Sequence, residues 1–163
     1  MADKDVITLT EGEVMLARTI ASLRTGLNRV TKVGQSMKIP NRDDFTNDLL
    51  GVCGEIAFAK RLNNLDLSFN PRSGGSDFNL RDNKTADVKT TDRDDGRLVV
   101  PKWKEKKPSD YYILVTGQVP VTSKPTEFTI RGYATSKEVF ANKINLGYGP
   151  CFGLTQDKLH QFK

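Results

Sequence analysis

The sequence predicts one domain of the α/β or α+β class, in which a central mixed sheet of about five strands is flanked by helices. Two observations favour this class. Two long segments with helical periodicity come first, and short strand-like segments separated by turn residues follow them. A chain of 163 residues without internal repeats or low-complexity tracts has the size expected for one hydrophobic core.

The first helix is predicted over residues 10–33. It opens with Thr10 and Glu13, which have the spacing of a capping box. Apolar residues then recur at helical intervals, at Leu16, Ile20, Leu23, Leu27 and Val30. Four basic residues lie on the other face, namely Arg18, Arg24, Arg29 and Lys32. We expect this basic face to be solvated or to contact a polyanion, and the heptad-like apolar spacing suggests a homodimer.

A loop at residues 34–44 connects this helix to a second one, predicted over residues 46–63. The segment "TNDLLGVCGEIAFAKRLN" has apolar or small residues on nearly every side, so this helix should be largely buried. It contains Cys53, and Cys151 lies far away in another apolar stretch. Because their spacing fits neither a disulfide framework nor a zinc site, both are expected to be buried thiols.

Strand signals follow at residues 65–69, 76–80, 85–91 and 97–100. The basic loop "PKWKEKKPS" comes next and leads into the apolar run "DYYILVTG", which predicts a strand in the middle of the sheet.

The C-terminal part begins with an alternating segment at residues 127–134, which is typical of a strand with one exposed face. Thr135 or Ser136 then caps a helix, and a strand stub and a short helix capped by Thr155 complete the chain. The predicted domain thus consists of the N-terminal helix at 10–33, a core at 46–134 and C-terminal helices within 135–163.

Composition limits the chemistry. The net charge of +5 mildly favours a polyanionic partner. The single histidine, His160, excludes sites built on paired histidines, so oxygen ligands would hold any metal ion. No apolar run is long enough to cross a bilayer and no secretory signal opens the sequence, so we expect a cytoplasmic protein without a membrane partner or an organic cofactor.

Two aspartates flank the turn-forming segment "RDNK". A turn centred on Asp82 places Asp77 directly opposite Asp87 and on the same face as Lys89. Two carboxylates with Cβ atoms about 5 Å apart would destabilise the hairpin unless a positive charge lies between them. A divalent cation would supply that charge.

Two alternatives remain for this hairpin. A turn centred between Asp82 and Asn83 would pair Asp77 with Val88, which is on the wrong face. The apolar pattern prefers the turn centred on Asp82, because that register pairs Phe78 with Ala86. The aspartates could also serve only the solubility of an edge hairpin.

Glu55 is an independent signal. The helix positions nearest to it are apolar or glycine: Gly51, Val52, Phe58, Ala59 and Leu62. A carboxylate on such a face must be neutralised, paired or bound to a metal. The alternative to a metal is a buried ion pair, with Lys89 or Arg131 as the candidate partners.

Glu55 on a helix, Asp77 on one strand, and Asp87 with Lys89 on the next strand resemble the active-site signature of the PD-(D/E)XK nuclease superfamily. The segments "GEIAFAK", "GGSDF", "ADVKTT" and "YYILVTG" are similar to its restriction-endonuclease-like core of a helix, three antiparallel strands, a helix and a further strand. The resemblance covers residues 49–117. Ser76 stands where the motif has proline, and residues 92–110 leave little room for the crossover helix. The small size also resembles phage-encoded members.

The resemblance implies a nuclease that hydrolyses phosphodiester bonds of DNA with Mg²⁺ or Mn²⁺. Asp77 and Asp87 would be the main metal ligands, and the backbone carbonyl of Val88 could complete the coordination. Glu55 would bind a second metal or a metal-bound water. Lys89 would orient the attacking water or stabilise the developing charge.

A nucleic-acid surface is expected around this site, made of Lys102, Trp103, Lys104, Lys106, Lys107 and Arg131. The alternative for residues 101–109 is a mobile surface loop. Two other functions stay open: a non-cleaving module of the same fold that binds nucleic acid or protein, and a nuclease acting on RNA.

Overall fold

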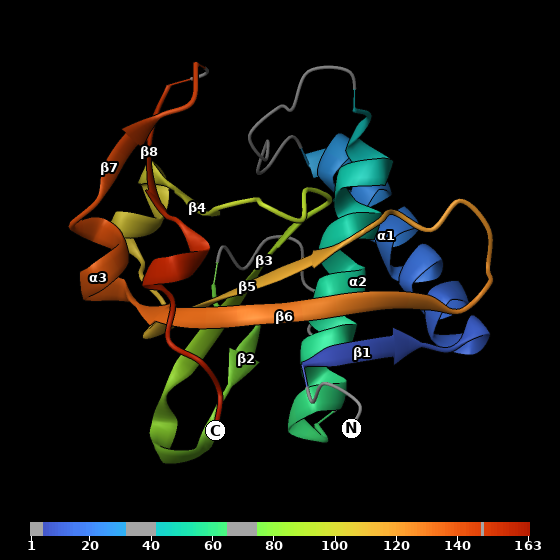
Figure 1. Ribbon diagram of the computed structural model, residues 1–163. Coiled ribbons are helices and arrows are strands. Elements are labelled where there is room, and N and C mark those ends of the chain that lie inside the picture. Colours follow the sequence, from blue (N-terminus) through green and yellow to red (C-terminus); the bar gives the residue numbers. More distant parts are fainter. Residues whose placement is uncertain (1–4, 32–41, 65–74, 148) are drawn as a thin grey trace.

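The computed structural model describes residues 5–31, 42–64, 75–147 and 149–163. Its centre is a five-stranded sheet with the order β1-β6-β5-β3-β2 (Figure 1). The strands are β1 (Val6–Leu9), β2 (Phe78–Asn79), β3 (Thr85–Thr91), β5 (Tyr111–Gly117) and β6 (Thr126–Thr135). Strands β3 and β5 run parallel and the other neighbours run antiparallel, so the sheet is mixed.

The α+β class, the mixed sheet of about five strands and the central place of β5 are therefore confirmed. Strand β1 was not predicted, because four residues beside the N-terminal helix carry too little periodicity. The strand expected at residues 65–69 and most of the loop expected at 34–44 lie outside the described residues.

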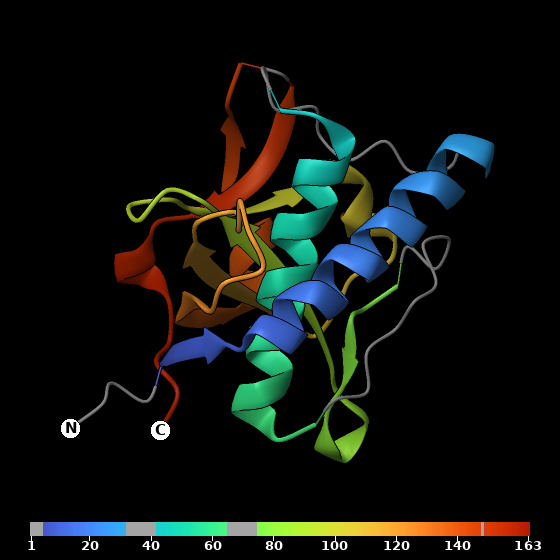
Figure 2. The same ribbon diagram turned by 90° about the vertical axis from the view of Figure 1, so that its right-hand side faces the viewer.

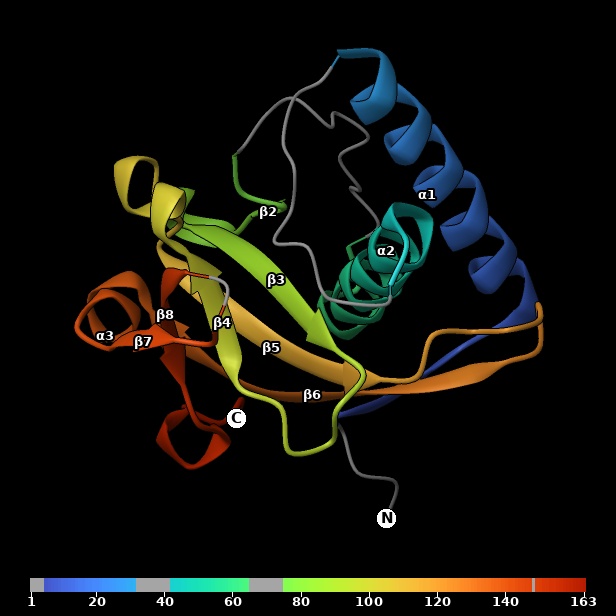
Figure 3. The ribbon, with the colours of Figure 1, turned by 90° about the horizontal axis from the view of Figure 1, so that it is seen from above.

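Two helices cover one face of the sheet, and α2 (Asp44–Leu62) lies between the sheet and α1 (Glu11–Thr31) (Figure 3). The predicted capping box opens α1, because the Thr10 N–H donates to Glu13 and the Glu13 N–H donates to Thr10 Oγ1. Helix α2 begins with the carboxylate of Asp43 accepting from the Thr46 N–H, and most of its residues are buried, as predicted.

The face that α1 turns inward differs from the predicted apolar stripe. Its buried residues are Val14, Ala17, Ile20, Ala21 and Thr25, whereas Leu23 is exposed and Val30 is 82% exposed. Helix α1 crosses α2 obliquely (Figure 2), and small side chains at the crossing let the two helices approach closely. As a result Arg18 and Arg24, expected on a solvated face, turn toward the protein, and Arg18 donates to the Pro120 carbonyl. Lys32 lies outside the described residues.

The other face of the sheet carries a second, smaller sheet where helices were expected. Its order is β4-β8-β7, built from β4 (Leu98–Pro101), β7 (Lys143–Asn145) and β8 (Pro150–Leu154). Leu98, Val100 and Phe152 pack there on Tyr112 and Leu114 of β5. This layer forms because Tyr112 and Leu114 give β5 an apolar second face.

The C-terminal region contains less helix than predicted. Thr135 caps α3 (Ser136–Phe140) in a capping box with Glu138, as expected, but α3 has only five residues before the chain enters β7. The helix expected after Thr155 is the single 3₁₀ turn η3 (Gln156–Lys158). Both thiols are buried as predicted, and burial raises the pKa of Cys53 to about 12.

Residues 92–110 connect the parallel strands β3 and β5 without an α-helix. They form β4 and the 3₁₀ turn η2 (Lys102–Lys106), so the segment expected as a loop is partly ordered. Within the described ranges, no helix is both long and apolar enough to cross a bilayer.

Candidate functional site

The hairpin of β2 and β3 has the register expected for a turn centred on Asp82. Phe78 pairs with Ala86, and Asn79 pairs with Thr85. Asp82 and Asn83 make the turn with φ angles of 63° and 58°, a left-handed conformation that short polar side chains tolerate. The prediction of this register is confirmed, and the alternative turn centred between Asp82 and Asn83 is wrong.

Asp77 lies just before β2, beside the edge of β3. Its Oδ2 accepts a hydrogen bond of 2.7 Å from the backbone N–H of Val88. Strand β2 begins only at Phe78, and no strand in the described part of the chain pairs with residues 88–91 on that side. The Asp77 side chain therefore satisfies a backbone donor on an otherwise open sheet edge.

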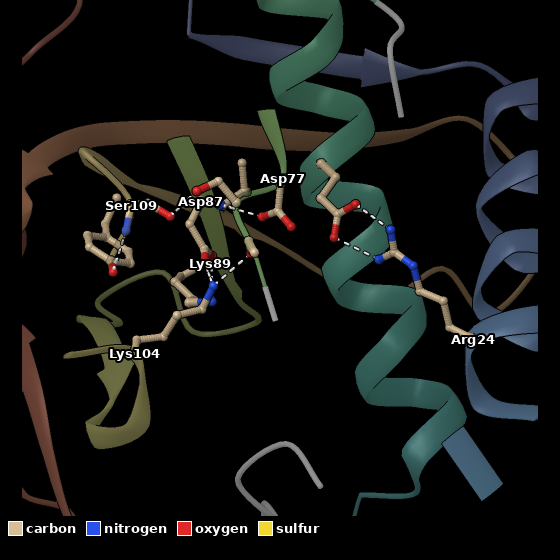
Figure 4. A network of polar contacts seen from close by, with 11 residues as sticks. Arg24, Asp77, Asp87, Lys89, Lys104 and Ser109 are labelled. Carbon is tan, nitrogen blue, oxygen red and sulfur yellow. Dashed lines mark hydrogen bonds and ion pairs between the residues drawn. The ribbon is translucent and has the colours of Figure 1, made fainter. Parts of the chain in front are cut away.

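Asp87 and Lys89 share one face of β3, as predicted. Ala86 and Val88 belong to the core beneath α2, so the residues that alternate with them point toward the side of the second sheet. The Nζ of Lys89 lies 2.5 Å from Oδ1 of Asp87. Helix α2 and this pair thus approach β3 from opposite sides, and Asp77 lies at the edge between them (Figure 4).

Asp87 is held by two lysines. Only 1% of it is exposed, and Lys104 Nζ contacts its Oδ2 while Lys89 contacts Oδ1. Burial opposes its charge, but the two ammonium groups outweigh burial and lower the pKa of Asp87. Burial likewise opposes the charge of Lys89, and the carboxylates of Asp87 and Asp77 outweigh it and raise the pKa of Lys89.

Lys104 corrects the prediction of a basic surface. It was expected to face nucleic acid, yet it is 3% exposed and its Nζ also donates to the Gly75 carbonyl at 2.9 Å. The buried carboxylate of Asp87 needs positive charge, and the long lysine stem reaches it from η2. The remaining members of the predicted surface on this segment are exposed, namely Lys102, Trp103, Lys106 and Lys107.

Arg131 lies apart from these groups. It projects from β6, two strands away from β3, where its Nε donates to Thr116 Oγ1 at 2.7 Å. Its guanidinium also pairs with Asp94 at 3.5 Å. The structure does not bring Arg131 together with Asp87 and Lys89.

Glu55 is partnered by Arg24. The two carboxylate oxygens accept from the two terminal nitrogens of Arg24, both at 2.8 Å, and Glu55 is 8% exposed. Burial opposes the charge on Arg24, but Glu55 outweighs it and raises the pKa of Arg24. A buried ion pair was one of the two expectations for Glu55, but Lys89 and Arg131 were the wrong partners.

Asp77 connects the two halves of this arrangement. Burial raises its pKa well above the usual value, and the negative charges of Glu55 and Asp87 raise it further. Figure 4 shows Asp77 between α2 and the pair of Asp87 and Lys89. Asp77 is therefore close enough to feel the charges of Glu55 and Asp87, whereas Glu55 and the Asp87–Lys89 pair lie on opposite sides of β3.

Each carboxylate already has a protein partner. Glu55 binds Arg24, Asp77 binds the Val88 N–H, and Asp87 binds the two lysines. Across the described residues, no three acidic, histidine or cysteine side chains are arranged to hold a metal ion.

The donor set nevertheless suits a hard divalent cation. Carboxylates and a backbone carbonyl are the ligands that Mg²⁺ prefers. Asp87 Oδ1 is buried and lies 2.5 Å from the ammonium group of Lys89. The negative charges of Glu55 and Asp87 raise the pKa of Asp77 and so oppose the charged form of its carboxyl group. A divalent cation would favour the charged form of Asp77 and would compete with the two ammonium groups for Asp87.

Close packing positions the site. A Cβ on Gly54 would lie 1.9 Å from Thr90 Oγ1, so glycine lets α2 approach β3 directly beside Glu55. On the other side, the hydroxyls of Ser76 and Ser109 are 2.6 Å apart, which ties the segment before Asp77 to the segment before β5.

Sequence reasoning missed Arg24 and Lys104. A signal existed for Arg24, because Ala17, Ala21 and Thr25 recur every four residues and mark the side of α1 that can approach another helix. For Lys104 no local signal exists, since its burial depends on Asp87, a residue far away in the chain.

No family model, curated protein or solved structure matches this chain. The assignment of a function therefore depends on the geometry of the site.

Proposed function

We propose that this protein is a metal-dependent nuclease of the restriction-endonuclease-like fold that hydrolyses phosphodiester bonds of DNA. The observation that carries the proposal is the position of Asp77 at the open edge of β3, where the charges of both Glu55 and Asp87 act on it and Lys89 pairs with Asp87. The succession of α2, β2 and β3 supports it, because a helix followed by an antiparallel strand pair opens that core. The chain departs from the core after β3, since β3 and β5 run parallel and β4 and η2, without an α-helix, connect them.

Asp77 and Asp87 would hold Mg²⁺ or Mn²⁺, with the carbonyl of Val88 as a further oxygen ligand. Glu55 would hold a second ion or a water molecule. Because Glu55 is paired with Arg24, the same carboxylate would then have to contact both Arg24 and the new ligand. The bound ion would supply Lewis-acid chemistry, by neutralising the phosphate and acidifying water. Lys89, beside Asp87, would orient the attacking water or stabilise charge that develops on the phosphate.

The exposed residues of η2 offer a contact for the nucleic-acid backbone. Lys102, Lys106 and Lys107 carry positive charge, and Trp103 is 51% exposed and could stack on a base. Lys104, in the same turn, contacts Asp87. A strand bound along η2 would thus run beside the acidic groups, and these contacts with phosphate carry no sequence preference.

A cleavage assay tests the proposal. Plasmid DNA, linear DNA and an RNA of matched sequence are incubated with the protein and Mg²⁺ or Mn²⁺, and with a chelator instead. We expect metal-dependent cleavage of DNA that falls at least about a hundredfold in Asp77→Asn and in Lys89→Met. Asp157→Asn and Lys143→Met, which change the same charges at exposed positions, are the controls. Full activity in both site variants would disprove the catalytic assignment, and preferential cleavage of RNA would change the substrate.

A non-cleaving nucleic-acid-binding module is the second candidate. One observation favours it: all three carboxylates are satisfied by groups of the protein itself. Such a module would retard DNA in a gel and leave it whole in Mg²⁺ and Mn²⁺. The same variants separate the candidates, because Asp77→Asn would then not affect binding.

A further inference from the structure

Lys104 occupies a position suited to a cation. Its Nζ contacts two oxygen atoms, Oδ2 of Asp87 and the carbonyl of Gly75, and the residue is 3% exposed. These are oxygen ligands of the kind that Mg²⁺ takes. The ammonium thus satisfies the carboxylate that, in the proposed nuclease, is a main metal ligand.

The carboxylate of Asp87 is neutralised without a metal. Among the described residues, Lys89 and Lys104 both pair with it. A divalent cation bound to Asp87 would add two positive charges beside these two ammonium groups in a largely buried place. Such an excess is costly unless one cation moves away or an anion arrives.

Lys104 is the cation best able to move. Arg24 is fixed by two parallel hydrogen bonds to Glu55, and Lys89 belongs to β3, where its backbone pairs with Leu114 of β5. Lys104 instead comes from η2, a short 3₁₀ helix whose other residues are exposed, and its flexible stem can carry the ammonium to a new partner. The neighbouring Lys102 and Lys106 are exposed and would bring a phosphate close to it.

We propose that Lys104 is a resident counter-ion of the site, which neutralises Asp87 in the metal-free protein and leaves it when a divalent cation binds. This inference rests on the proposed function. The displaced ammonium needs an anionic partner, and a phosphodiester of the nucleic acid supplies one. Metal and nucleic acid therefore bind with positive coupling, and each raises the affinity of the protein for the other.

The first test measures metal affinity without nucleic acid. Mn²⁺ is titrated calorimetrically into the native protein, Lys104→Met and Lys143→Met. Methionine keeps most of the lysine stem but not the charge, and Lys143 is an exposed lysine of β7. We expect Lys104→Met to bind Mn²⁺ about tenfold to a hundredfold more tightly, the scale on which groups around a metal site act, and Lys143→Met to match the native protein. Unchanged or weaker binding by a folded Lys104→Met would overturn the inference.

The second test needs no variant. An amine-reactive reagent labels the native protein, and peptide mass spectrometry follows each lysine. Without metal, Lys104 should react much more slowly than Lys143. Saturating Mn²⁺ without DNA should raise the labelling of Lys104 severalfold relative to that of Lys143. Protection that persists in saturating Mn²⁺ would contradict displacement.

The two proposals fail in different ways. If the native protein binds Mn²⁺ and cleaves DNA while Lys104→Met leaves the Mn²⁺ affinity unchanged, only the counter-ion role is wrong. If neither protein binds Mn²⁺, and the native protein does not cleave, the nuclease itself is wrong and the inference falls with it.

Discussion

The Asp77 carboxylate, one residue before β2, accepts a hydrogen bond from the Val88 N–H, where β3 continues beyond its pairing with β2 as an open edge. A short acidic side chain thus replaces a backbone partner in the sheet. It also brings Asp77 between Glu55 and Asp87, whose charges act on it. One hydrogen bond accordingly links the end of the hairpin to the geometry of the acidic site.

The charge of Asp77 should destabilise the metal-free fold. Because burial and the neighbouring carboxylates raise its folded-state pKa, the folded state holds its proton more tightly than the unfolded state. The stability that this proton gives is complete below the unfolded pKa and is lost as the pH rises through the folded pKa. In Asp77→Asn the side-chain amide oxygen can still accept the hydrogen bond from the Val88 N–H, but the side chain carries no charge. We expect Asp77→Asn to be about 1–3 kcal/mol more stable than the native protein at pH 8, with a smaller gain at pH 4. Thermal unfolding across this pH range in a chelator is the measurement, and a uniform loss of stability would refute the prediction.

Asp87→Asn should have the opposite effect. Two lysines lower the pKa of Asp87, so its contribution to stability is present above the unfolded pKa and is lost as the pH falls through the folded pKa. The variant leaves Lys89 and Lys104 with unpaired charges in a largely buried place. We expect a loss of about 3–5 kcal/mol near neutral pH that shrinks in acid, measured by urea unfolding at several pH values. A loss that stays constant down to acid pH would contradict the ion-pair explanation.

Gly54 should tolerate no side chain. A Cβ there would meet Thr90 Oγ1 at 1.9 Å, whereas nothing lies within 4 Å of a Cβ at Gly51 in the same helix. We expect Gly54→Ala to cost about 1–3 kcal/mol through overpacking and to reduce cleavage, because it pushes Glu55 away from β3. The matched control, Gly51→Ala, should stabilise α2 by about 0.5–1 kcal/mol. Chemical unfolding of both variants measures the difference, and equal effects would show that α2 does not pack on β3 as described.

The parts of the site that the sequence predicts are those determined by local chemistry. Asp82 and Asn83 favour a left-handed turn, and the turn fixes the register that brings Asp77 to Asp87. The environment of Lys104 could not be predicted, because its position depends on a tertiary contact between η2 and β3. The inward face of α1 was missed for a related reason. Its contact with α2 depends on the small residues Ala17 and Ala21, whereas the larger apolar residues of the stripe point outward.

Arg24 should be essential for the stability of the metal-free protein. Its guanidinium is the partner that the structure gives to the Glu55 carboxylate, through two hydrogen bonds of 2.8 Å in a largely buried place. Arg24→Met keeps much of the apolar stem and leaves Glu55 without its counter-charge. We expect a loss of about 3–5 kcal/mol in a chelator, measured by thermal unfolding.

The same variant also tests whether Glu55 can bind a metal ion. Freed from Arg24, Glu55 should take part in binding Mg²⁺, so Mg²⁺ should stabilise Arg24→Met more than it stabilises the native protein. Arg29→Met is the matched control, because Arg29 is exposed on the same helix, and it should stay within about 0.5 kcal/mol of the native protein. If Mg²⁺ raised the melting temperatures of Arg24→Met and Arg29→Met equally, Glu55 would be a structural ion-pair partner of Arg24 and not a ligand.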